Sequence, residues 1–479
     1  MMKKLFGFVL AFCLMAGLLC VTAFAAEAPG EDVMLRISAE KKNGTVVTVA
    51  DYKNFVEGWD AAMKLGGSGS ALKQNAYVRV IVDIYADWNA VNGEFYQDGR
   101  DAICFPENVR ITLNLNGHTI NRGLSEYQYN GCVLYIDEKA DVVINDGTIT
   151  GGFSYNTAGG IHIEDDAKVV LNGVNVVGNT VHQNRGAAIA MYDNASLTMN
   201  GGRVSDNAIY AFYNTLEPGE GTLYVSESTA VLNDVTISGN RAMNYVAEGV
   251  AIAIDGDGSV TMNNGIVENN GRKDKNGAFL AGSIFFGDAK NGRLILNKTT
   301  VRNNGASGTY DNNLYTSLFF VNGSLQMNGC NVTGNAPATI FHVWDTYSTI
   351  GNIQNSVFTD NVSQIIRCYG YDKGAVYTFT GCRFHNNKGL ESLYSFEGDY
   401  RLKLTLVDCD LGNSTFTLKK YINITNARSF MTASAFGEGS LVMVIAVAAL
   451  VVSCASLGMQ ITSKKKKTAY EKSSGEDDE

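Results

Sequence analysis

Proline is nearly absent from this sequence, with 4 residues in 479, whereas glycine occurs 51 times. This balance excludes a proline-rich stalk and favours many tight turns between short strands. Basic residues do not cluster in the body of the chain, and the formal net charge is -10. Nucleic acid is therefore not an expected partner. The apolar fraction of 45% excludes global disorder and supports a large core.

Motifs for metals and nucleophiles are missing as well. The 9 cysteines include no C-x-x-C pair, and the 5 histidines show no H-E-x-x-H or other paired spacing. A zinc site or a nucleophilic centre therefore has little support in the sequence. We predict no catalytic residues, no metal ligands and no cofactor.

Both ends of the chain carry membrane signals. Residues 1–25 have lysines, an apolar run and a small-x-small site, which is the layout of a cleaved signal peptide. Residues 439–463 lack charge and exceed the roughly 20 apolar residues that span a bilayer. Four lysines begin the tail 464–479, which places that tail in the cytoplasm. No LPxTG-like sorting motif precedes the apolar run. We expect a single-pass cell-membrane protein with an extracellular ectodomain.

A repeat of about 30 residues fills the region between these signals. Segments such as VVLNGVNVVGN (169–179) and AVLNDVTISGN (230–240) place an aliphatic pair before one Asn and a second Asn seven residues later. Each period holds three short stretches with alternating apolar residues, and no segment long enough for a crossover helix. Such a pattern predicts an all-β coil of about 10–11 rungs, a parallel β-helix.

The two asparagines of each repeat predict two ladders of stacked amides at buried corners. The first Asn is the marker of each rung, and the second starts the following corner. Asn also tolerates the left-handed backbone of a turn, so both ladders are expected to be structural. The marker positions are Asn116, Asn145, Asn172, Asn200, Asn233, Asn263, Asn297 and Asn328, followed by Gln354, Thr380 and Val407. The second ladder contains Asn179, Asn207, Asn240, Asn270, Asn304, Asn335, Asn361 and Asn387.

Six cysteines lie in the expected ectodomain: Cys104, Cys132, Cys330, Cys368, Cys382 and Cys409. Three of them, Cys330, Cys382 and Cys409, stand two residues after the marker, at a small inward site. A stack of buried thiols is the simpler interpretation. A disulfide between Cys382 and Cys409 is the alternative, although directly stacked strands rarely give the torsion it needs.

The repeats divide the ectodomain into three parts. Residues 26–75 form an N-terminal cap region, in which residues 51–65 predict an amphipathic helix that begins at Asp51 and ends before Gly66. Its apolar face, with Tyr52, Phe55, Val56, Trp59 and Met63, would cover the exposed end of the coil. Residues 76–414 form the β-helix, and residues 415–438 form a juxtamembrane stalk.

The GGIHI (159–163) and GAAIA (186–190) openings, with recurring Asn corners, resemble the right-handed β-helix repeats of pectate-lyase-like proteins. They are also similar to the repeats of polymorphic outer-membrane adhesins. VRITLNLNGHTI (109–120) looks like the first full rung of β-helix surface proteins from Gram-positive bacteria. The resemblance implies a right-handed, single-stranded coil but no particular activity, because this fold hosts lyases, hydrolases and adhesins alike.

A series of acidic residues follows the first strand of the rungs: Asp137, Asp165, Asp193, Glu227, Asp255 and Asp288, then Asn322 and Asp345. Stacked carboxylates suit Ca²⁺, but Asp also simply makes turns. One acid per rung without a recurring basic partner favours the turn. The loop arginines and lysines, including Arg185, are expected to leave another corner, about 10–15 Å from these acids. The N-T-D and G-H-G signatures of pectin-degrading enzymes are not found.

Tyrosines recur in the variable loops that follow the second Asn ladder. Because these loops leave one corner, we expect an aromatic and polar stripe along the rod that binds a ligand. Its residues are Tyr127, Tyr155, Tyr210, Tyr213, Tyr245, Tyr310 and Tyr315. The main hypothesis is a non-catalytic adhesin or binding protein for a cell-surface glycan or protein. The alternative is a polysaccharide lyase or glycoside hydrolase of the pectate-lyase-like group.

Overall fold

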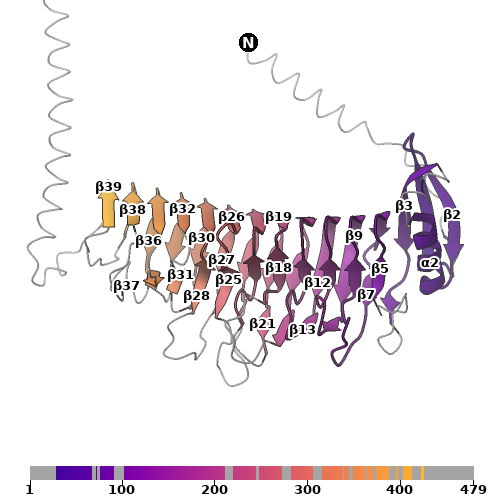
Figure 1. Ribbon diagram of the computed structural model, residues 1–479, viewed down its shortest axis with the longest axis horizontal. Helices are drawn as coiled ribbons and strands as arrows, with labels where there is room; N and C mark the ends of the chain where they lie inside the picture. The colour runs from indigo at the N-terminus through magenta and orange to yellow at the C-terminus, as the bar shows by residue number, and fades with distance from the viewer. Residues whose placement is uncertain are drawn as a thin grey trace, which may run out of the picture.

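The structure is a computed structural model. It describes residues 29–66, 72, 76–90, 102–210, 220–243, 247–271, 282–305, 316–337, 339–344, 349–361, 364–369, 374–387, 395–396, 403–412 and 422–425. Figure 1 shows a rod of stacked strands, with a helix and two antiparallel strands at its N-terminal end.

A small antiparallel sheet begins the described chain. β1 (Leu35–Lys41) pairs with β2 (Val46–Tyr52) on one side and with β3 (Tyr77–Ile84) on the other, both antiparallel. β3 then pairs with β6 (Arg110–Asn114) in parallel and so starts the coil. A shift in register leaves Val49 of β2 as a bulge residue. A bulge on an edge strand twists it and hinders pairing with another chain.

The capping helix is present but shorter than expected. α2 spans Phe55–Gly66, and Asn54 caps it by accepting a hydrogen bond from the Glu57 backbone N–H at 3.1 Å. The prediction that Asp51 caps the helix is wrong, because Asp51 lies in β2 and forms an ion pair with Arg36 at 2.7 Å. Tyr52 ends β2 rather than joining the helix, and Val56 is exposed.

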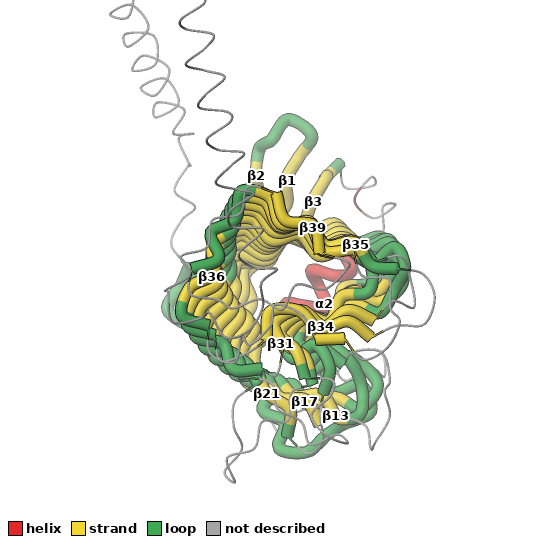
Figure 2. Tube along the Cα trace, turned by 90° about the vertical axis from the view of Figure 1, so that its left-hand side faces the viewer, coloured by secondary structure: helices red, strands yellow, loops and turns green. Residues whose placement is uncertain are grey.

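The helix nevertheless covers the end of the coil, as Figure 2 shows in its end-on view. Trp59 is buried, stacks edge-to-face on Phe105 with ring centroids 5.0 Å apart, and donates from Nε1 to the Cys104 carbonyl at 3.2 Å. Phe55 stacks on Trp88 at 5.0 Å. These contacts bury the apolar end of the first turn, which would otherwise face water.

One face of the coil is a parallel sheet of 11 strands. These strands are β5 (Ile103–Phe105), β8 (Leu134–Ile136), β11 (Ile161–Ile163), β14 (Ile189–Met191), β18 (Leu223–Ser226), β22 (Ile252–Asp255), β25 (Ser283–Gly287), β28 (Ser317–Val321), β31 (Thr339–Trp344), β34 (Gln364–Tyr369) and β37 (Ser395–Phe396).

The other two faces form a single 24-stranded sheet that bends at the marker position. Besides β1, β2, β3 and β6 it contains β4 (Trp88–Asn89), β7 (Thr119–Asn121), β9 (Asp141–Thr150), β12 (Lys168–Val177), β15 (Ser196–Asn200), β16 (Arg203–Ser205), β19 (Thr229–Asn233), β20 (Thr236–Ser238), β23 (Ser259–Asn263), β24 (Ile266–Glu268), β26 (Arg293–Asn297), β27 (Thr300–Arg302), β29 (Ser324–Asn328), β30 (Asn331–Thr333), β32 (Ile350–Gln354), β33 (Val357–Thr359), β35 (Val376–Thr380), β36 (Arg383–His385), β38 (Lys403–Val407) and β39 (Ile422–Thr425).

The core lies inside this coil. In β12, for example, Val169 and Leu171 point inward before the bend, and Val174 and Val176 point inward after it. Each such aliphatic side chain contributes about 1.5–3 kcal/mol when fully buried. Towards the C-terminal end aromatic rings take over, and Phe285, Phe319 and Phe341 stack with centroids 4.7 and 5.3 Å apart.

The marker asparagines form a half-exposed ladder on the outside of the bend. Each side-chain amide donates to the Asn of the preceding turn at 2.7–2.9 Å, from Asn297 back to Asn145. The first member is Asn114 rather than the expected Asn116, because Asn114 aligns with Asn145 in the register. The expectation of a buried corner is wrong for this ladder, since Asn200 and Asn328 are exposed.

The second Asn ladder is buried, as predicted. In Asn240, Oδ1 accepts from both the backbone N–H and the side-chain amide of Asn207 at 3.0 Å, and Nδ2 donates to the Val204 carbonyl at 3.0 Å. Asn240 donates in turn to Asn270, and the pattern continues to Asn387. Each amide therefore satisfies backbone groups at a corner that no water reaches.

Left-handed backbone occurs beside the ladder asparagines rather than at them. The residue after the marker is left-handed, as at Asp146, Gly173 and Asp234. At the other corner the residue before the buried Asn is left-handed, as at Gly178 and Asp206. The asparagines are thus selected for hydrogen bonding, and their Gly, Asp and Asn neighbours for the turn.

The inward cysteine positions are confirmed. Cys330, Cys382 and Cys409 are buried and free, so the alternative of a Cys382–Cys409 disulfide does not hold in this structure. Their thiols donate to backbone carbonyls instead, with Cys409 Sγ 3.3 Å from the Phe379 oxygen. Burial raises the pKa of the Cys330 thiol.

The two ladders differ in burial, and we expect them to differ in stability. Asn240→Leu leaves two donors of Asn207 and the Val204 carbonyl without partners inside the rod, and should cost about 3 kcal/mol. Asn233→Leu breaks the outer ladder where water can replace the lost bonds, and should cost about 1 kcal/mol. Urea unfolding followed by circular dichroism measures both. Equal losses would show that burial does not distinguish the two ladders.

Candidate functional site

A third, short sheet lies outside the coil and was not predicted. After the buried ladder the chain continues into β10 (Phe153–Ser154), β13 (Thr180–His182), β17 (Ala208–Tyr210) and β21 (Arg241–Ala242), which pair in parallel. Figure 2 shows β13, β17 and β21 in a lobe outside the ring of the coil. Ser154, Val181, Ile209 and Ala242 are buried in this sheet. Their neighbours Tyr155, His182 and Tyr210 follow the strand alternation to the other side.

Five aromatic side chains gather on this outer sheet: Tyr127, Phe153, Tyr155, His182 and Tyr210. We call them the aromatic cluster. The ring of Tyr127 stacks on that of His182 with centroids 4.4 Å apart and planes 23° apart. His182 lies 5.9 Å from Tyr155 and 5.7 Å from Tyr210, and Phe153 stacks on Tyr210 at 5.6 Å. Tyr127 remains 53% exposed and Tyr155 39% exposed, so the cluster presents ring surface to solvent.

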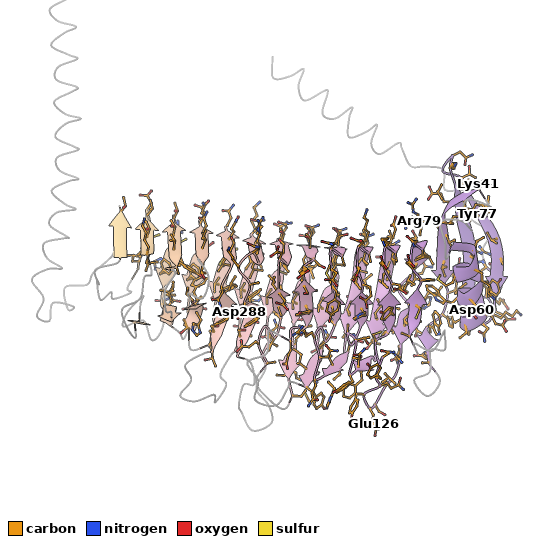
Figure 3. All side chains as sticks on the ribbon, viewed as in Figure 1. Lys41, Asp60, Tyr77, Arg79, Glu126 and Asp288 are labelled. Atoms are coloured by element: carbon orange, nitrogen blue, oxygen red, sulfur yellow. The ribbon has the colours of Figure 1, made fainter. Side chains whose placement is uncertain are left out.

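The polar atoms of the cluster are held by neighbouring loops. The Asn184 side-chain amide donates to the Tyr155 carbonyl at 3.0 Å, and the Gln183 backbone N–H donates to the Tyr210 carbonyl at 2.7 Å. His182 Nδ1 is buried and has no hydrogen-bond partner among the described residues. Glu126 precedes Tyr127 and lies at the edge of the lobe in Figure 3. The surface suits a ligand with an apolar face and hydroxyl groups.

The structure brings together three of the predicted ligand-binding residues, Tyr127, Tyr155 and Tyr210. Tyr213, Tyr245, Tyr310 and Tyr315 lie outside the described residues. Sequence reasoning missed Phe153 and His182. The signal was the equal spacing of His182 and Tyr210 from Asn179 and Asn207, which places both at one register position. Tyr155 follows Gly152 at the same spacing, because Phe153 and Ser154 pair with Thr180 and Val181.

A second row of rings runs along the outer face of the 11-stranded sheet. Tyr135, His162, Tyr192 and Tyr224 follow one another with centroids 4.9, 5.2 and 5.7 Å apart. Tyr135 donates to Glu164 Oε1 at 2.6 Å, and His162 Nε2 lies 2.9 Å from the same oxygen. Burial raises the pKa of Tyr192 to about 12, and burial raises the pKa of Tyr224 as well. These phenols therefore stay protonated at neutral pH.

The acidic residues do not form the single series that the sequence predicted. Asp137, Asp255, Asp288 and Asn322 share one register position, whereas Asp165, Asp193 and Glu227 come one residue later. The intervening turns carry Glu164, Tyr192 and Ser226 at the first position. Asp193 and Glu227 have left-handed backbone, which supports a role in the turn. Asp345 lies outside the described residues.

Negative charges lie close to one another at these turns. Burial, together with the negative charges of Asp193 and Glu164, raises the pKa of the Asp165 carboxyl. No group of three or more His, Cys, Asp or Glu side chains that could hold a metal ion occurs in the described part of the chain.

The expected separation between the loop cations and the acids is wrong for Arg185. Its Nη1 donates to the Tyr224 hydroxyl at 2.9 Å and lies 4.0 Å from Asp255 Oδ2. The guanidinium carbon stands 5.0 Å from the centre of the Tyr224 ring. The prediction used the distance between corners, and the long arginine side chain reaches across that distance. Arg185 pairs with one carboxylate, and the Tyr224 hydroxyl donates to the same Asp255 at 2.8 Å.

Comparison with known families agrees with this geometry. Residues 107–304 match the family model described as a right-handed β-helix region. The chain contains a right-handed parallel β-helix. No curated protein and no solved structure matches the chain. The β-helix is a fold of surface proteins and of enzymes, so the match assigns the architecture and not the activity.

The expected membrane span lies outside the described residues. Within the ranges that the structure describes, no helix is both long and apolar enough to cross a membrane. The apolar run 439–463 is not among those ranges, and neither is the expected signal peptide 1–25.

Proposed function

We propose that this protein is a cell-surface binding protein whose β-helix holds a glycan at the aromatic cluster. The observation that carries the proposal is the gathering of five rings on one outer sheet, three of them from successive turns of the coil. Rings at one register position repeat at the strand spacing of about 4.8 Å along the rod. A chain-like ligand lying along the rod axis would therefore meet one ring in each turn.

The chemistry of the cluster favours an uncharged, hydroxyl-rich ligand. Tyrosine combines an apolar face with a hydroxyl group and loses little conformational entropy on binding. The ring faces would cover the apolar face of a sugar, and the phenol and imidazole groups would take hydrogen bonds from its hydroxyls. Among the described residues, Glu126 precedes Tyr127, and Arg241 pairs with Ala208, two residues before Tyr210.

A location at the cell surface is consistent with the proposed binding function. The signal peptide 1–25 would direct export, the apolar run 439–463 would anchor the protein in the cell membrane, and the lysines after it would hold the tail inside. The predicted stalk 415–438 is shorter than expected, because β39 (Ile422–Thr425) still pairs with β38 of the coil. Residues 426–438 would then separate the β-helix from the membrane. The rod would present the aromatic cluster at a distance from the cell, as suits an adhesin.

Removal of an exposed ring should weaken binding without unfolding the rod. Tyr127→Ala and Tyr155→Ala should each weaken binding of a neutral hexasaccharide at least about fivefold, since stacking on an aromatic ring contributes more than about 1 kcal/mol at a binding hot spot. A screen of the soluble ectodomain against cellohexaose, chitohexaose and mannohexaose identifies the probe, and calorimetry measures its affinity. Tyr129→Ala is the matched control, because Tyr129 is 66% exposed and lies outside the cluster.

The thermal unfolding midpoint of both variants should remain within about 2 °C of the wild type, since surface substitutions change stability little. Binding of an acidic glycan in preference to all neutral ones would contradict the proposed ligand class. A loss of binding that follows loss of folding would mean that the tyrosines are part of the scaffold.

The ectodomain should not cleave polygalacturonate, with or without calcium. A β-elimination needs a base that takes a proton at working pH. Here Tyr192 and Tyr224 remain protonated, and Arg185 already donates to Tyr224. Absorbance of unsaturated products in the ultraviolet follows the reaction. Product that forms with the wild type and disappears with Asp193→Ala or Asp255→Ala would establish the lyase alternative instead.

Protease treatment of intact cells should remove the ectodomain and spare a tag placed after residue 479. The lysines that follow the apolar run should keep this end in the cytoplasm, where the protease has no access. Permeabilised cells provide the control, because both parts should then be digested. Loss of the tag from intact cells would reverse the proposed orientation.

A further inference from the structure

The short segment between β13 and β14 touches the aromatic cluster through its backbone and one side chain. Asn184 holds the Tyr155 carbonyl of the preceding turn at 3.0 Å. Gln183, which is left-handed with φ 53°, donates its N–H to the Tyr210 carbonyl of the following turn at 2.7 Å. His182 itself is the last residue of β13. The position of this segment therefore determines where three rings of the cluster lie.

Arg185 of the same segment contacts the 11-stranded sheet. It lies across the Tyr224 ring, donates to the Tyr224 hydroxyl, and approaches Asp255, which accepts from that hydroxyl. Tyr224 belongs to β18 and Asp255 to β22, the next two turns of the coil. Arg185 and Asp255 side chains are 28% and 31% exposed, so water screens their ion pair in part. The cation–π contact and the hydrogen bond together make the contact directional.

A separate contact holds the backbone at the end of the segment. The Gly186 N–H donates to the Glu220 carbonyl at 2.8 Å and to the Gly221 carbonyl at 3.0 Å. Gly186 is left-handed, and an added Cβ would stand 2.6 Å from the Cβ of Ala190 and from the Ile189 carbonyl oxygen. These bonds do not involve the Arg185 side chain. Loss of that side chain should therefore loosen residues 183–185 while the coil keeps its path.

We infer that Arg185 is a positioning residue of the aromatic cluster. The inference rests on the proposed binding function of that cluster. We call the contact of Arg185 with Tyr224 the clamp. The clamp fixes the position of residues 183–185, and Asn184 in turn fixes the Tyr155 carbonyl. The rings of Tyr155 and His182 are therefore already in place when the ligand binds. A ligand that meets an ordered cluster does not have to supply the free energy of ordering it. The clamp also joins the cluster to two turns of the coil that do not contribute rings to it.

Affinity for the ligand should decrease as the contact between Arg185 and Tyr224 is weakened. Arg185→Ala should weaken binding of the neutral hexasaccharide selected above about tenfold, and Tyr224→Phe, which removes the hydroxyl, about threefold. Arg185→Lys should restore part of the loss, since it keeps the charge but not the planar stacking. Arg203→Ala is the matched control, because Arg203 is an exposed arginine on β16 and its removal changes the net charge equally. It should bind like the wild type.

A double-mutant cycle separates positioning from a general structural role. Because Arg185 acts through the cluster, Arg185→Ala should have a smaller effect on affinity in a Tyr155→Ala background than in the wild type. Thermal unfolding midpoints of Arg185→Ala and Arg203→Ala should agree. Additive losses in affinity, or wild-type affinity in Arg185→Ala, would overturn the inference. If Arg185→Ala does not fold, Arg185→Lys and Tyr224→Phe provide the same cycle.

A measurement without ligand distinguishes this inference from the proposed function. With 3-fluorotyrosine at position 155, the fluorine signal reports the surroundings of that ring. Arg185→Ala should shift or broaden the signal, and Arg203→Ala should leave it unchanged. If none of the three hexasaccharides binds the wild type, the proposed glycan function fails, and this signal alone decides whether Arg185 positions the ring. An unchanged signal in Arg185→Ala would refute the positioning role.

Discussion

The buried asparagine ladder is the interaction on which the architecture depends. At each turn one side-chain amide accepts from the backbone N–H and the amide of the Asn before it, and donates to a carbonyl of an earlier strand and to the Asn after it. A corner inside the rod would otherwise leave these backbone groups without partners, at a cost of about 1–3 kcal/mol each. The ladder therefore allows the chain to turn sharply where water cannot solvate it, and it repeats the same path in every turn.

The same corner creates the candidate site. Because the chain leaves each buried asparagine in a fixed direction, the residues that follow Asn179, Asn207 and Asn240 stack in register as β13, β17 and β21. β10 joins the same sheet after Gly152, whose N–H donates to Asn179. Strands of two or three residues are enough to form this sheet, since the asparagine ladder has already aligned the chain in successive turns. Alternation then separates Val181 and Ile209, which are buried, from His182 and Tyr210, which join the cluster. The site is thus a direct product of scaffold geometry.

The fold could be predicted from the sequence because the same sequence pattern recurs in successive turns. The aliphatic pair and the two asparagines recur at a regular spacing, so an error at one turn, such as Asn116 for Asn114, does not change the architecture. The N-terminal cap was predicted only in part, since the hairpin of β1 and β2 occurs once and carries no repeat signal. The buried and half-exposed ladders look alike in sequence, and only the path of the chain separates them.

The site was predicted in outline for similar reasons. Tyr127, Tyr155 and Tyr210 stood out because tyrosine recurs in the loops, whereas His182 occupies the same register position with a different ring. The reach of Arg185 could not be predicted, because corner geometry gives Cα positions and not where a long side chain ends. The division of the acids into two positions depends on a one-residue shift that only strand pairing reveals.

The number of residues between successive members of the buried ladder varies, and the hydrogen bonds do not. Neighbouring asparagines are 26 residues apart at Asn335 and Asn361 and 34 apart at Asn270 and Asn304, yet both pairs bond at 3.0 Å. The added length lies between the buried asparagine and the next strand of the 11-stranded sheet: Asn270 is followed by β25 (Ser283–Gly287), whereas Asn335 is followed much sooner by β31 (Thr339–Trp344). Insertions and deletions between these two points therefore need no compensating change in the core. Natural variation can alter what the rod recognises while its mechanical frame stays constant, in the way that antibody loops vary on a fixed framework.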